Sequence, residues 1–277
     1  QRGRGTAMSI PQPKPLERSA VFVANGAAIY YEVCGAPIET ARVVFIWGHG
    51  WGQDLNAFRA TASSFTDAAH VLLDFPGFGA SPPPPQGWGT QHYADACFEL
   101  LSSFAFAGKK VVWVGHSFGG RVGIQLTARH PGVMSGLCLV ASAGLPRRRT
   151  ALQTAKHHIR IRAFKLLRML PVSGAPFEWL RARMGSADYR NAGAMRSVLV
   201  SVVNENLTDV ARKISCPCLL IYGENDTETP PDIGERLSRL IPNSTLSILP
   251  NNDHYSVLGA GRHLVVKRLV AFLEQLN

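Results

Sequence analysis

One serine of the chain lies in a pattern that can support nucleophilic chemistry. The hexapeptide Gly115-His116-Ser117-Phe118-Gly119-Gly120 follows the apolar run Lys110–Val114 and precedes the helix-like segment Arg121–Arg129. A buried strand, a Gly-x-Ser-x-Gly turn and a helix in this order are what a nucleophile elbow requires. The turn strains the backbone of the serine, and the glycines let neighbouring backbone pass without a Cβ clash. Ser117 is therefore a candidate nucleophile, although a tight strand–helix turn without chemistry can have the same pattern.

The elements around this turn predict an α/β fold. Short apolar, β-rich runs alternate with amphipathic helical stretches, which is typical of a mostly parallel sheet with helices on both faces. The first two runs flank Asn25-Gly26, a strong signal for a hairpin. We expect strands over Ala20–Val23, Ala28–Val33, Val43–Trp47, Val71–Leu73, Lys110–Val114, Leu137–Val140, Cys218–Tyr222 and Thr245–Leu249, and helices over Ala57–Phe65, Tyr93–Phe106 and His263–Leu276.

The strand pattern is interrupted once, between the sixth and seventh expected strands. From about residue 145 to 206 the sequence is helical and rich in arginine. We therefore expect a core formed by residues 19–144 and 207–277, with a helical cap, 145–206, inserted after strand 6. Residues 1–18 are basic and are expected to form a poorly ordered leader or tail outside this fold.

Composition and charge exclude several classes of protein. Hydrophobic residues make up 46% and charged residues 17%, with 26 Gly and 18 Pro, which is typical of a turn-rich soluble globule. No stretch approaches the roughly 20 apolar residues of a membrane-spanning helix. The net charge of +10 comes without basic residues interleaved with aromatic ones, so we expect no nucleic-acid partner.

Two features indicate the compartment. The first residues lack the apolar run of a secretory signal, so we expect a cytoplasmic protein. The cysteines are odd in number and scattered, and Cys216-Pro217-Cys218 lacks the spacing of a redox or zinc hairpin. Free thiols in a reducing compartment are the expected outcome.

Two further motifs extend the pattern of the elbow. His49-Gly50-Trp51-Gly52 follows the strand Val43–Trp47, and Asp74-Phe75-Pro76-Gly77-Phe78-Gly79-Ala80-Ser81 follows the next strand. In their order and spacing, these motifs and the elbow resemble the α/β-hydrolase superfamily over about residues 20–277. The similar branch contains small esterases, lactonases, carbon–carbon bond hydrolases and cofactor-free haloperoxidases. The resemblance implies an eight-stranded sheet and chemistry without a cofactor or metal ion.

The resemblance also implies an acid and a base, in the chain order Ser, acid, His. Gly223-Glu224-Asn225-Asp226 matches the family's Gly-x-x-Asp turn, so Asp226 is the candidate acid; Glu224 and Glu228 are nearby alternatives off the matching position. His254 follows the last strand, where the catalytic histidine is expected. The usual Gly-x-His reads Asn252-Asp253-His254 here, and Asn tolerates the positive φ of a tight turn.

The family position also assigns the oxyanion hole, which needs two backbone N–H donors. These come from Trp51 and Phe118, whose side chains would line the pocket. Trp179, Met184 and Met195 are candidates to cover an apolar acyl pocket, although core packing explains them as well. Other histidines have structural interpretations: His49 would organise the oxyanion loop, His116 would shape the elbow, and His130 lies at a helix end.

The expected cap carries a basic segment. Eight cations and no acid lie between residues 147 and 168. A cap helix with a solvated basic face is the favoured interpretation; attraction of an anionic substrate, or peripheral contact with anionic lipid, are the alternatives. The cations are Arg147, Arg148, Arg149, Lys156, Arg160, Arg162, Lys165 and Arg168.

These features predict a serine hydrolase that cleaves a small to medium, largely apolar carboxylic ester through an acyl-Ser117 intermediate. A lactonase or a carbon–carbon bond hydrolase could use the same triad, and a small-ligand receptor of the hydrolase fold could retain it with little turnover. Serine at the elbow argues against haloalkane dehalogenase and epoxide hydrolase chemistry, because those relatives use Asp there. The expected partner is a small-molecule substrate, and the sequence does not indicate an oligomeric state.

Overall fold

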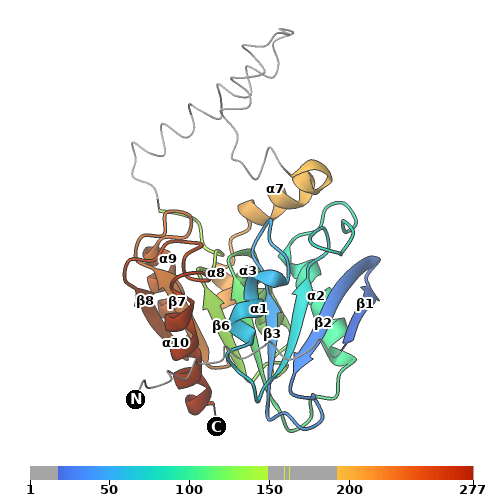
Figure 1. The fold of residues 1–277 in the computed structure, drawn as a ribbon. Helices are drawn as coiled ribbons and strands as arrows, with labels where there is room; N and C mark the ends of the chain where they lie inside the picture. Colours follow the sequence, from blue (N-terminus) through green and yellow to red (C-terminus); the bar gives the residue numbers. More distant parts are fainter. Residues whose placement is uncertain (1–17, 149–158, 160–161, 163–191, 277) are drawn as a thin grey trace, which may run out of the picture.

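The fold is an α/β sandwich built on a single eight-stranded sheet (Figure 1). The computed structural model describes residues 18–148, 159, 162 and 192–276. The strand order is β1-β2-β4-β3-β5-β6-β7-β8, and the pairs from β4 to β8 are parallel whereas β1, β2 and β4 pair antiparallel. The strands are β1 (Arg18–Ala24), β2 (Ala27–Gly35), β3 (Val43–Gly48), β4 (Ala69–Asp74), β5 (Lys110–His116), β6 (Gly136–Val140), β7 (Cys218–Gly223) and β8 (Ser244–Leu249).

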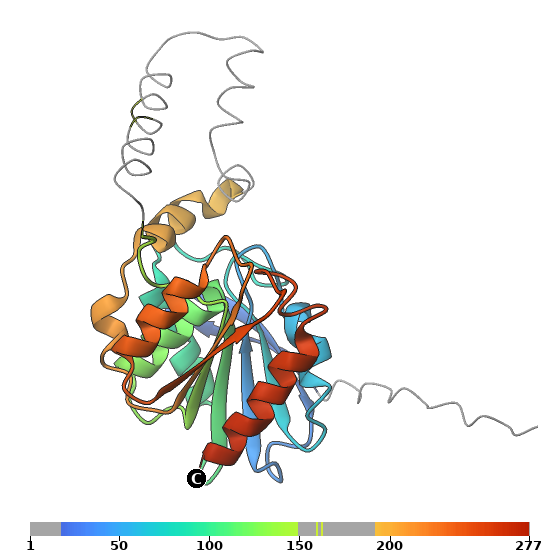
Figure 2. The same ribbon diagram turned by 90° about the vertical axis from the view of Figure 1, so that its left-hand side faces the viewer.

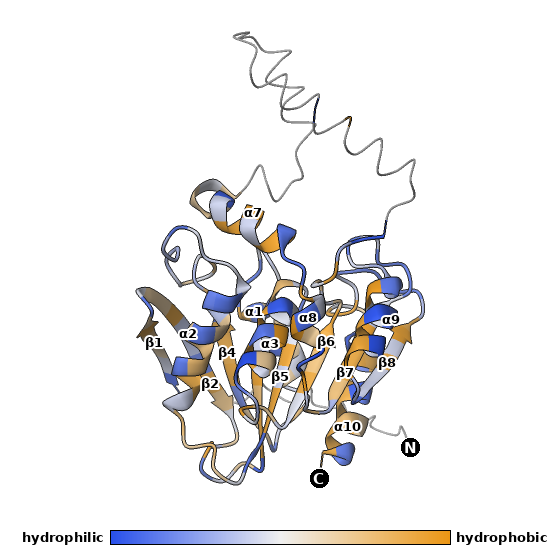
Figure 3. Cartoon of the chain, turned by 180° about the vertical axis from the view of Figure 1, so that it is seen from behind, coloured by the Kyte–Doolittle hydropathy of each residue, from blue (hydrophilic) through white to orange (hydrophobic). Residues whose placement is uncertain are grey.

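Two layers of helices cover the sheet, because the central strands are apolar on both faces. On one face α1 (Asn56–Ala62) and α10 (Arg262–Gln275) pack against side chains such as Phe45 and Leu72. On the other face α2 (Thr90–Ser102), α3 (Phe118–Arg129), α8 (Thr208–Ala211) and α9 (Pro231–Leu240) pack against side chains such as Ile46 and Val71. Figure 2 shows α9 and α10 on opposite sides of the sheet, and Figure 3 shows the hydrophobic strands behind helices with hydrophilic outer faces. The predicted fold class is confirmed.

The chain between β6 and β7 leaves the sheet and returns to it. Within the described residues it contains the 3₁₀ turn η1 (Gly193–Met195), then α7 (Arg196–Asn204) and α8. Figure 1 shows α7 above the upper ends of the strands. Leu207 donates its backbone N–H to the carbonyl oxygen of Gly144 over 2.8 Å, so the two ends of the excursion lie side by side.

Several element limits differ from the prediction for tertiary reasons. The helix expected over Tyr93–Phe106 ends at Ser102, because Phe104 stacks on Phe106 and meets Tyr31 instead of continuing the helix. The short helix α1 ends at Ala62. Helix α9 was not predicted.

Two remaining observations concern the termini and the membrane. The described chain begins at Arg18, the first residue of β1; residues 1–17 of the expected tail 1–18 lie outside the described part. None of the helices in the described ranges is long and apolar enough to cross a membrane.

Candidate active site

Ser117 occupies the strained turn between β5 and α3. Its backbone has φ 48° and ψ −103°, and its N–H donates to the carbonyl oxygen of Val140 over 3.0 Å. A Cβ on Gly115 would lie 2.3 Å from the carbonyl oxygen of Gly119, and one on Gly119 would lie 2.1 Å from that of Gly48. Both glycines are therefore required for the close backbone approach, as the sequence predicted.

Asp226 and His254 form a buried pair at the neighbouring strand ends. The His254 Nδ1 lies 2.8 Å from Asp226 Oδ2, and the two side chains are 5% and 0% exposed. The other oxygen, Asp226 Oδ1, accepts the backbone N–H groups of Glu228 and Thr229, each over 2.8 Å. Burial raises the pKa of Asp226, but the hydrogen bonds from His254 and Thr229 together outweigh it, so the net pKa is lowered. This carboxyl is an anion at neutral pH and fixes a proton on His254 Nδ1.

Thr229 is a residue of this site that the sequence analysis missed. Its hydroxyl lies 2.8 Å from Asp226 Oδ2, 2.9 Å from the carbonyl oxygen of Ala141 and 3.1 Å from His254 Nδ1. It therefore joins the acid turn to the end of β6. Its position three residues after Asp226 in a turn was the available signal, because Asp side chains commonly bind backbone N–H groups two or three residues ahead.

Neither of the two alternative carboxylates is in contact with His254 Nδ1. Glu224 Oε2 accepts the backbone N–H of Asn251 over 3.1 Å, and Glu228 Oε2 lies 3.6 Å from His254 Nε2, on the opposite side of the ring from Asp226. Asp226 is thus the carboxylate that the structure brings to Nδ1.

The turn before His254 differs in detail from the prediction. The positive φ falls on Asn251, at 56°, and Asn252 is not among the residues with positive φ. Asn252 is instead buried, and its amide Nδ2 donates to the carbonyl oxygen of Pro250 over 2.8 Å. The position expected to need a left-handed conformation therefore supplies a side-chain hydrogen bond.

His116 and Gln53 contact the backbone of the two loops that carry His254 and Trp51. Burial lowers the pKa of His116 to about 3, so the ring is neutral and carries one N–H. The shorter contact, 2.9 Å from Nε2 to the carbonyl oxygen of His254, takes that proton. Gln53 Oε1 accepts the backbone N–H of Gly50 over 2.7 Å and lies 3.1 Å from His116 Nδ1. Gln53, which the sequence analysis missed, thus fixes the oxyanion loop by a hydrogen bond to Gly50; its contact with His116 Nδ1 joins two acceptor atoms and is not a hydrogen bond in this tautomer.

His49 organises the loop that carries Trp51. Its Nε2 accepts the backbone N–H of Phe75 over 3.1 Å, so its proton is on Nδ1, which lies 2.7 Å from the carbonyl oxygen of Gly50. Burial lowers its pKa to about 4, which keeps the ring neutral. His130 lies apart, at the C-terminus of α3, where it binds Asp95.

Trp51 and Phe118 meet beside Ser117. Their rings are 5.6 Å apart and perpendicular, at 87°. Within the described residues, neither backbone N–H has an acceptor, so both are available to bind a developing negative charge. The Phe118 ring also packs on Phe75, Phe78 and Tyr93, so it belongs to an aromatic cluster of the core as well.

Of the other three pocket candidates, Met195 lies in the described part of the chain. Met195 is buried against Gly77 of the loop after β4, where a Cβ would lie 2.3 Å from its Sδ. Trp179 and Met184 lie outside the described residues. Of the basic segment, Arg147, Arg148 and Arg162 are described and exposed, and the Arg147 guanidinium donates to the carbonyl oxygen of Glu228.

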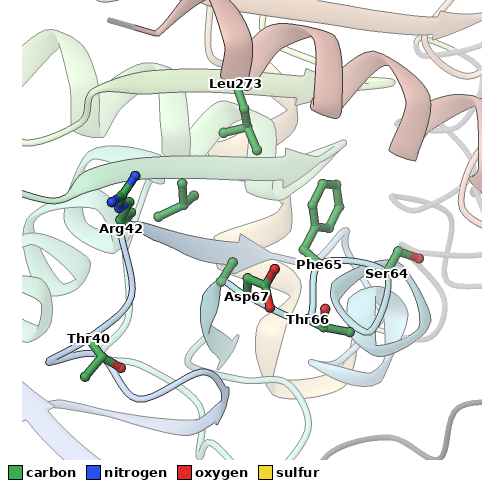
Figure 4. Close-up of a pocket in the computed structure, with 9 residues that line it drawn as sticks. Thr40, Arg42, Ser64, Phe65, Thr66, Asp67 and Leu273 are labelled. Atoms are coloured by element: carbon green, nitrogen blue, oxygen red, sulfur yellow. The ribbon is translucent and has the colours of Figure 1, made fainter.

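A hollow of about 520 Å³ lies at the ends of the strands opposite to those that carry Ser117, Asp226 and His254. Figure 4 shows Arg42, Phe65 and Leu273 among its lining side chains. Arg42 directly precedes β3 and Phe65 lies shortly before β4, so the hollow is at the amino ends of the parallel strands. Ser117, Asp226 and His254 all follow carboxyl ends, where ligands bind in open α/β sheets, so this hollow is not part of the candidate site.

Comparison with known proteins gives consistent results. A family model described as "Alpha/beta hydrolase family" matches residues 43–268. Over 244 residues the chain is 26% identical to the pimeloyl-(acyl-carrier protein) methyl ester esterase of Vibrio cholerae, a match that covers 82% of this chain and 91% of that protein.

Solved structures share the fold. A thermophilic esterase from Thermogutta terrifontis superimposes with a TM-score of 0.68 at 20% identity, covering 94% of this chain and 99% of the other. The enol-lactonase from Burkholderia xenovorans LB400 gives a TM-score of 0.68 at 18% identity, covering 92% and 100%.

Proposed function

Because the chain belongs to the alpha/beta hydrolase family and is a hydrolase, we propose that it cleaves a small to medium, largely apolar carboxylic ester through an acyl-Ser117 intermediate. The observation that carries this proposal is the 2.8 Å contact between Asp226 Oδ2 and His254 Nδ1. This pair follows the carboxyl ends of β7 and β8, and Ser117 follows the carboxyl end of β5. A proton fixed on Nδ1 leaves Nε2 as the basic nitrogen of the ring. A neutral imidazole with one free lone pair is what a weak serine nucleophile needs.

Acylation follows from this arrangement. His254 Nε2 removes the hydroxyl proton of Ser117 as Oγ bonds to the ester carbonyl carbon, and the carbonyl oxygen becomes an oxyanion. The backbone N–H groups of Trp51 and Phe118 stabilise that charge. When the carbon–oxygen bond to the alcohol breaks, the imidazolium returns its proton to the leaving oxygen, so the alcohol departs neutral.

Deacylation repeats the same steps with water. His254 takes a proton from water as its oxygen attacks the acyl carbon, and the oxyanion forms again at the same donors. Collapse breaks the bond to Ser117 Oγ, which regains a proton from His254. Asp226 stays ionised throughout and stabilises the imidazolium.

The named relative supports an ester as the substrate, since it is called a methyl ester esterase. Aromatic side chains around Phe118 and Trp51 support an acyl group that is largely apolar. A lactone or a carbon–carbon bond next to a ketone would use the same three residues, and a receptor could bind such a molecule with little turnover. We further propose residues 145–206 as the cap; the cytoplasmic location remains a prediction.

Turnover of p-nitrophenyl esters of increasing acyl length tests the proposal, with a panel of lactones and Ser117→Ala as the control. Many turnovers per chain that are lost in Ser117→Ala support an ester hydrolase. Turnover of lactones alone would replace it by a lactonase. A single slow turnover with retained ligand would indicate a receptor, and undiminished turnover by Ser117→Ala would contradict the assigned nucleophile.

A further inference from the structure

The imidazole of His254 lies between two carboxylates. Asp226 occupies Nδ1, and Glu228 Oε2 lies 3.6 Å from Nε2, the atom that exchanges protons in the proposed reaction. The Glu228 side chain is 48% exposed, whereas that of His254 is 5% exposed. Glu228 therefore approaches the buried base from the side that is open to solvent.

Glu228 is held in this position from several directions. Its backbone N–H donates to Asp226 Oδ1, so the turn that places the acid also places Glu228. Its Oε1 accepts the hydroxyl of Tyr255 over 3.1 Å, and the Tyr255 ring stands perpendicular to that of His254, with centroids 5.1 Å apart. Arg147 donates to the Glu228 carbonyl oxygen. The carboxylate oxygen that remains, Oε2, is the one directed to His254.

Other titratable and charged groups also surround His254 in the described part of the chain. Asp226 comes from the turn after β7. Asp253 and Tyr255 are the chain neighbours of His254 in the loop after β8. His116, at the end of β5, has its ring centroid 4.8 Å from that of His254 and is neutral. Among these groups, Glu228 is the one that meets Nε2.

We propose that Glu228 is a positioning residue whose carboxylate stabilises the imidazolium form of His254 from the Nε2 side. The role rests on the proposed function, in which His254 is neutral in the free enzyme and charged in the transition state. An anion 3.6 Å away attracts that charge in both the protonated free enzyme and the transition state. Glu228 thus adds to the effect of Asp226.

This role gives a distinctive pH dependence for Glu228→Gln. At acidic pH the free enzyme and the transition state both contain imidazolium, so the loss of the anion cancels and kcat/KM matches that of the wild type. At higher pH the free enzyme is neutral, so only the transition state loses stabilisation. The plateau falls roughly three- to tenfold, and the acid limb moves to lower pH by about half a unit to one unit.

The experiment is a kcat/KM profile from about pH 5.5 to about pH 9 for the wild type, Glu228→Gln and Glu235→Gln. Glu235 is the matched control, because its side chain is also 48% exposed and also lies 3.6 Å from a basic group, Arg239. Thermal unfolding of each variant checks that it is folded. High salt should move the wild type towards Glu228→Gln, since about 1 M salt reduces the Debye length to about 3 Å.

A second measurement needs no turnover. In the Ser117→Ala background, the ring proton signals of His254 in NMR should titrate at lower pH after Glu228→Gln and at an unchanged pH after Glu235→Gln. Convergent profiles at acidic pH together with this shift support the role. Profiles that fall in parallel at all pH values, or an unmoved titration, would overturn it. If the wild type does not turn over esters, the proposed function fails, and the NMR titration still decides whether Glu228 acts on His254.

Discussion

The backbone N–H of Asn225 donates a 2.8 Å hydrogen bond to the carbonyl oxygen of Asn252. Asn225 directly precedes Asp226, and Asn252 lies two residues before His254, so this bond joins the acid turn to the histidine loop through main-chain atoms. The Glu224 side chain adds a second connection by accepting the N–H of Asn251. The acid and the base are therefore held at their distance by the backbone as well as by their own contact.

Asp226→Asn should accordingly keep its loops and lose its chemistry. The amide cannot supply the anion that fixes the Nδ1 proton, so kcat should fall roughly ten-thousandfold, as for the equivalent change in a triad protease. Steady-state kinetics measures the loss, and circular dichroism checks the fold. Glu224→Gln is the control and should retain most activity. If Glu224→Gln abolished activity while Asp226→Asn retained it, Glu224 and not Asp226 would be the catalytic acid.

The sequence predicted the parts of this site that depend on local pattern. Buried runs such as Val43–Trp47 identify the strands, and the glycines around Ser117 identify the elbow, because both signals lie within a few residues. Gln53 was not identified, and Glu228 was considered only as an alternative acid, since their contacts with His116 and His254 depend on how distant loops meet. The end of α2 was missed for the same reason, because Phe104 packs on Tyr31 of another element.

We expect the free energy of unfolding to decrease at acidic pH because of two buried histidines. His70 Nδ1 accepts the indole N–H of Trp47 over 3.2 Å, and His49 Nε2 accepts the N–H of Phe75, so both rings must be neutral in the folded state. Burial lowers the pKa of each to about 4. Since the unfolded chain takes up protons first, stability is unaffected above about pH 6.5 and falls from there to about pH 4, by roughly 3 kcal/mol at most for each ring.

Urea unfolding at pH 7 and at pH 5 tests this for His70→Gln. The variant should lose less free energy of unfolding between the two pH values than the wild type, by roughly 1–2 kcal/mol, because one proton uptake is removed. His263→Gln, on the exposed surface of α10, is the control and should show the wild-type dependence. An unchanged dependence in His70→Gln would mean that this ring is not kept neutral by folding.

Glu205 connects the end of α7 to the start of α2. Its Oε1 accepts the backbone N–H of Thr90 over 2.7 Å, and its Oε2 binds the Thr90 hydroxyl. A carboxylate at a helix N-terminus satisfies a free donor and the helix dipole, so Glu205→Ala should lower the free energy of unfolding by about 1 kcal/mol. Thermal unfolding should show a decrease in Tm of roughly 2–4 °C. Glu235→Ala is the control, because that partly exposed side chain lies inside α9 and pairs with Arg239; an equal loss there would refute the capping role.

The basic segment is predicted to be a solvated face. Replacing Arg147, Arg148 and Arg149 with Gln should change kcat/KM on neutral esters by less than about threefold, because exposed charges contribute little and salt screens them. A raised KM for acidic esters alone, reproduced by added salt, would indicate recruitment of an anionic substrate. Co-sedimentation of the wild type with anionic vesicles at low salt, lost in the triple variant, would indicate a lipid contact.

Covalent labelling of the nucleophile tests the central claim most directly. Ser81 and Ser142 are buried, with hydroxyls that donate to the carbonyl oxygens of Asp74 and Ala143. Ser117 lies at the strained turn directly after His116, whose ring centroid is 4.8 Å from that of His254. A fluorophosphonate probe should modify one site per chain, and peptide mass spectrometry should locate it at Ser117. Ser117→Ala should lose the label and up to about a millionfold in turnover. A label on Ser81 or Ser142, or an unlabelled Ser117 in an enzyme that turns over esters, would contradict the account.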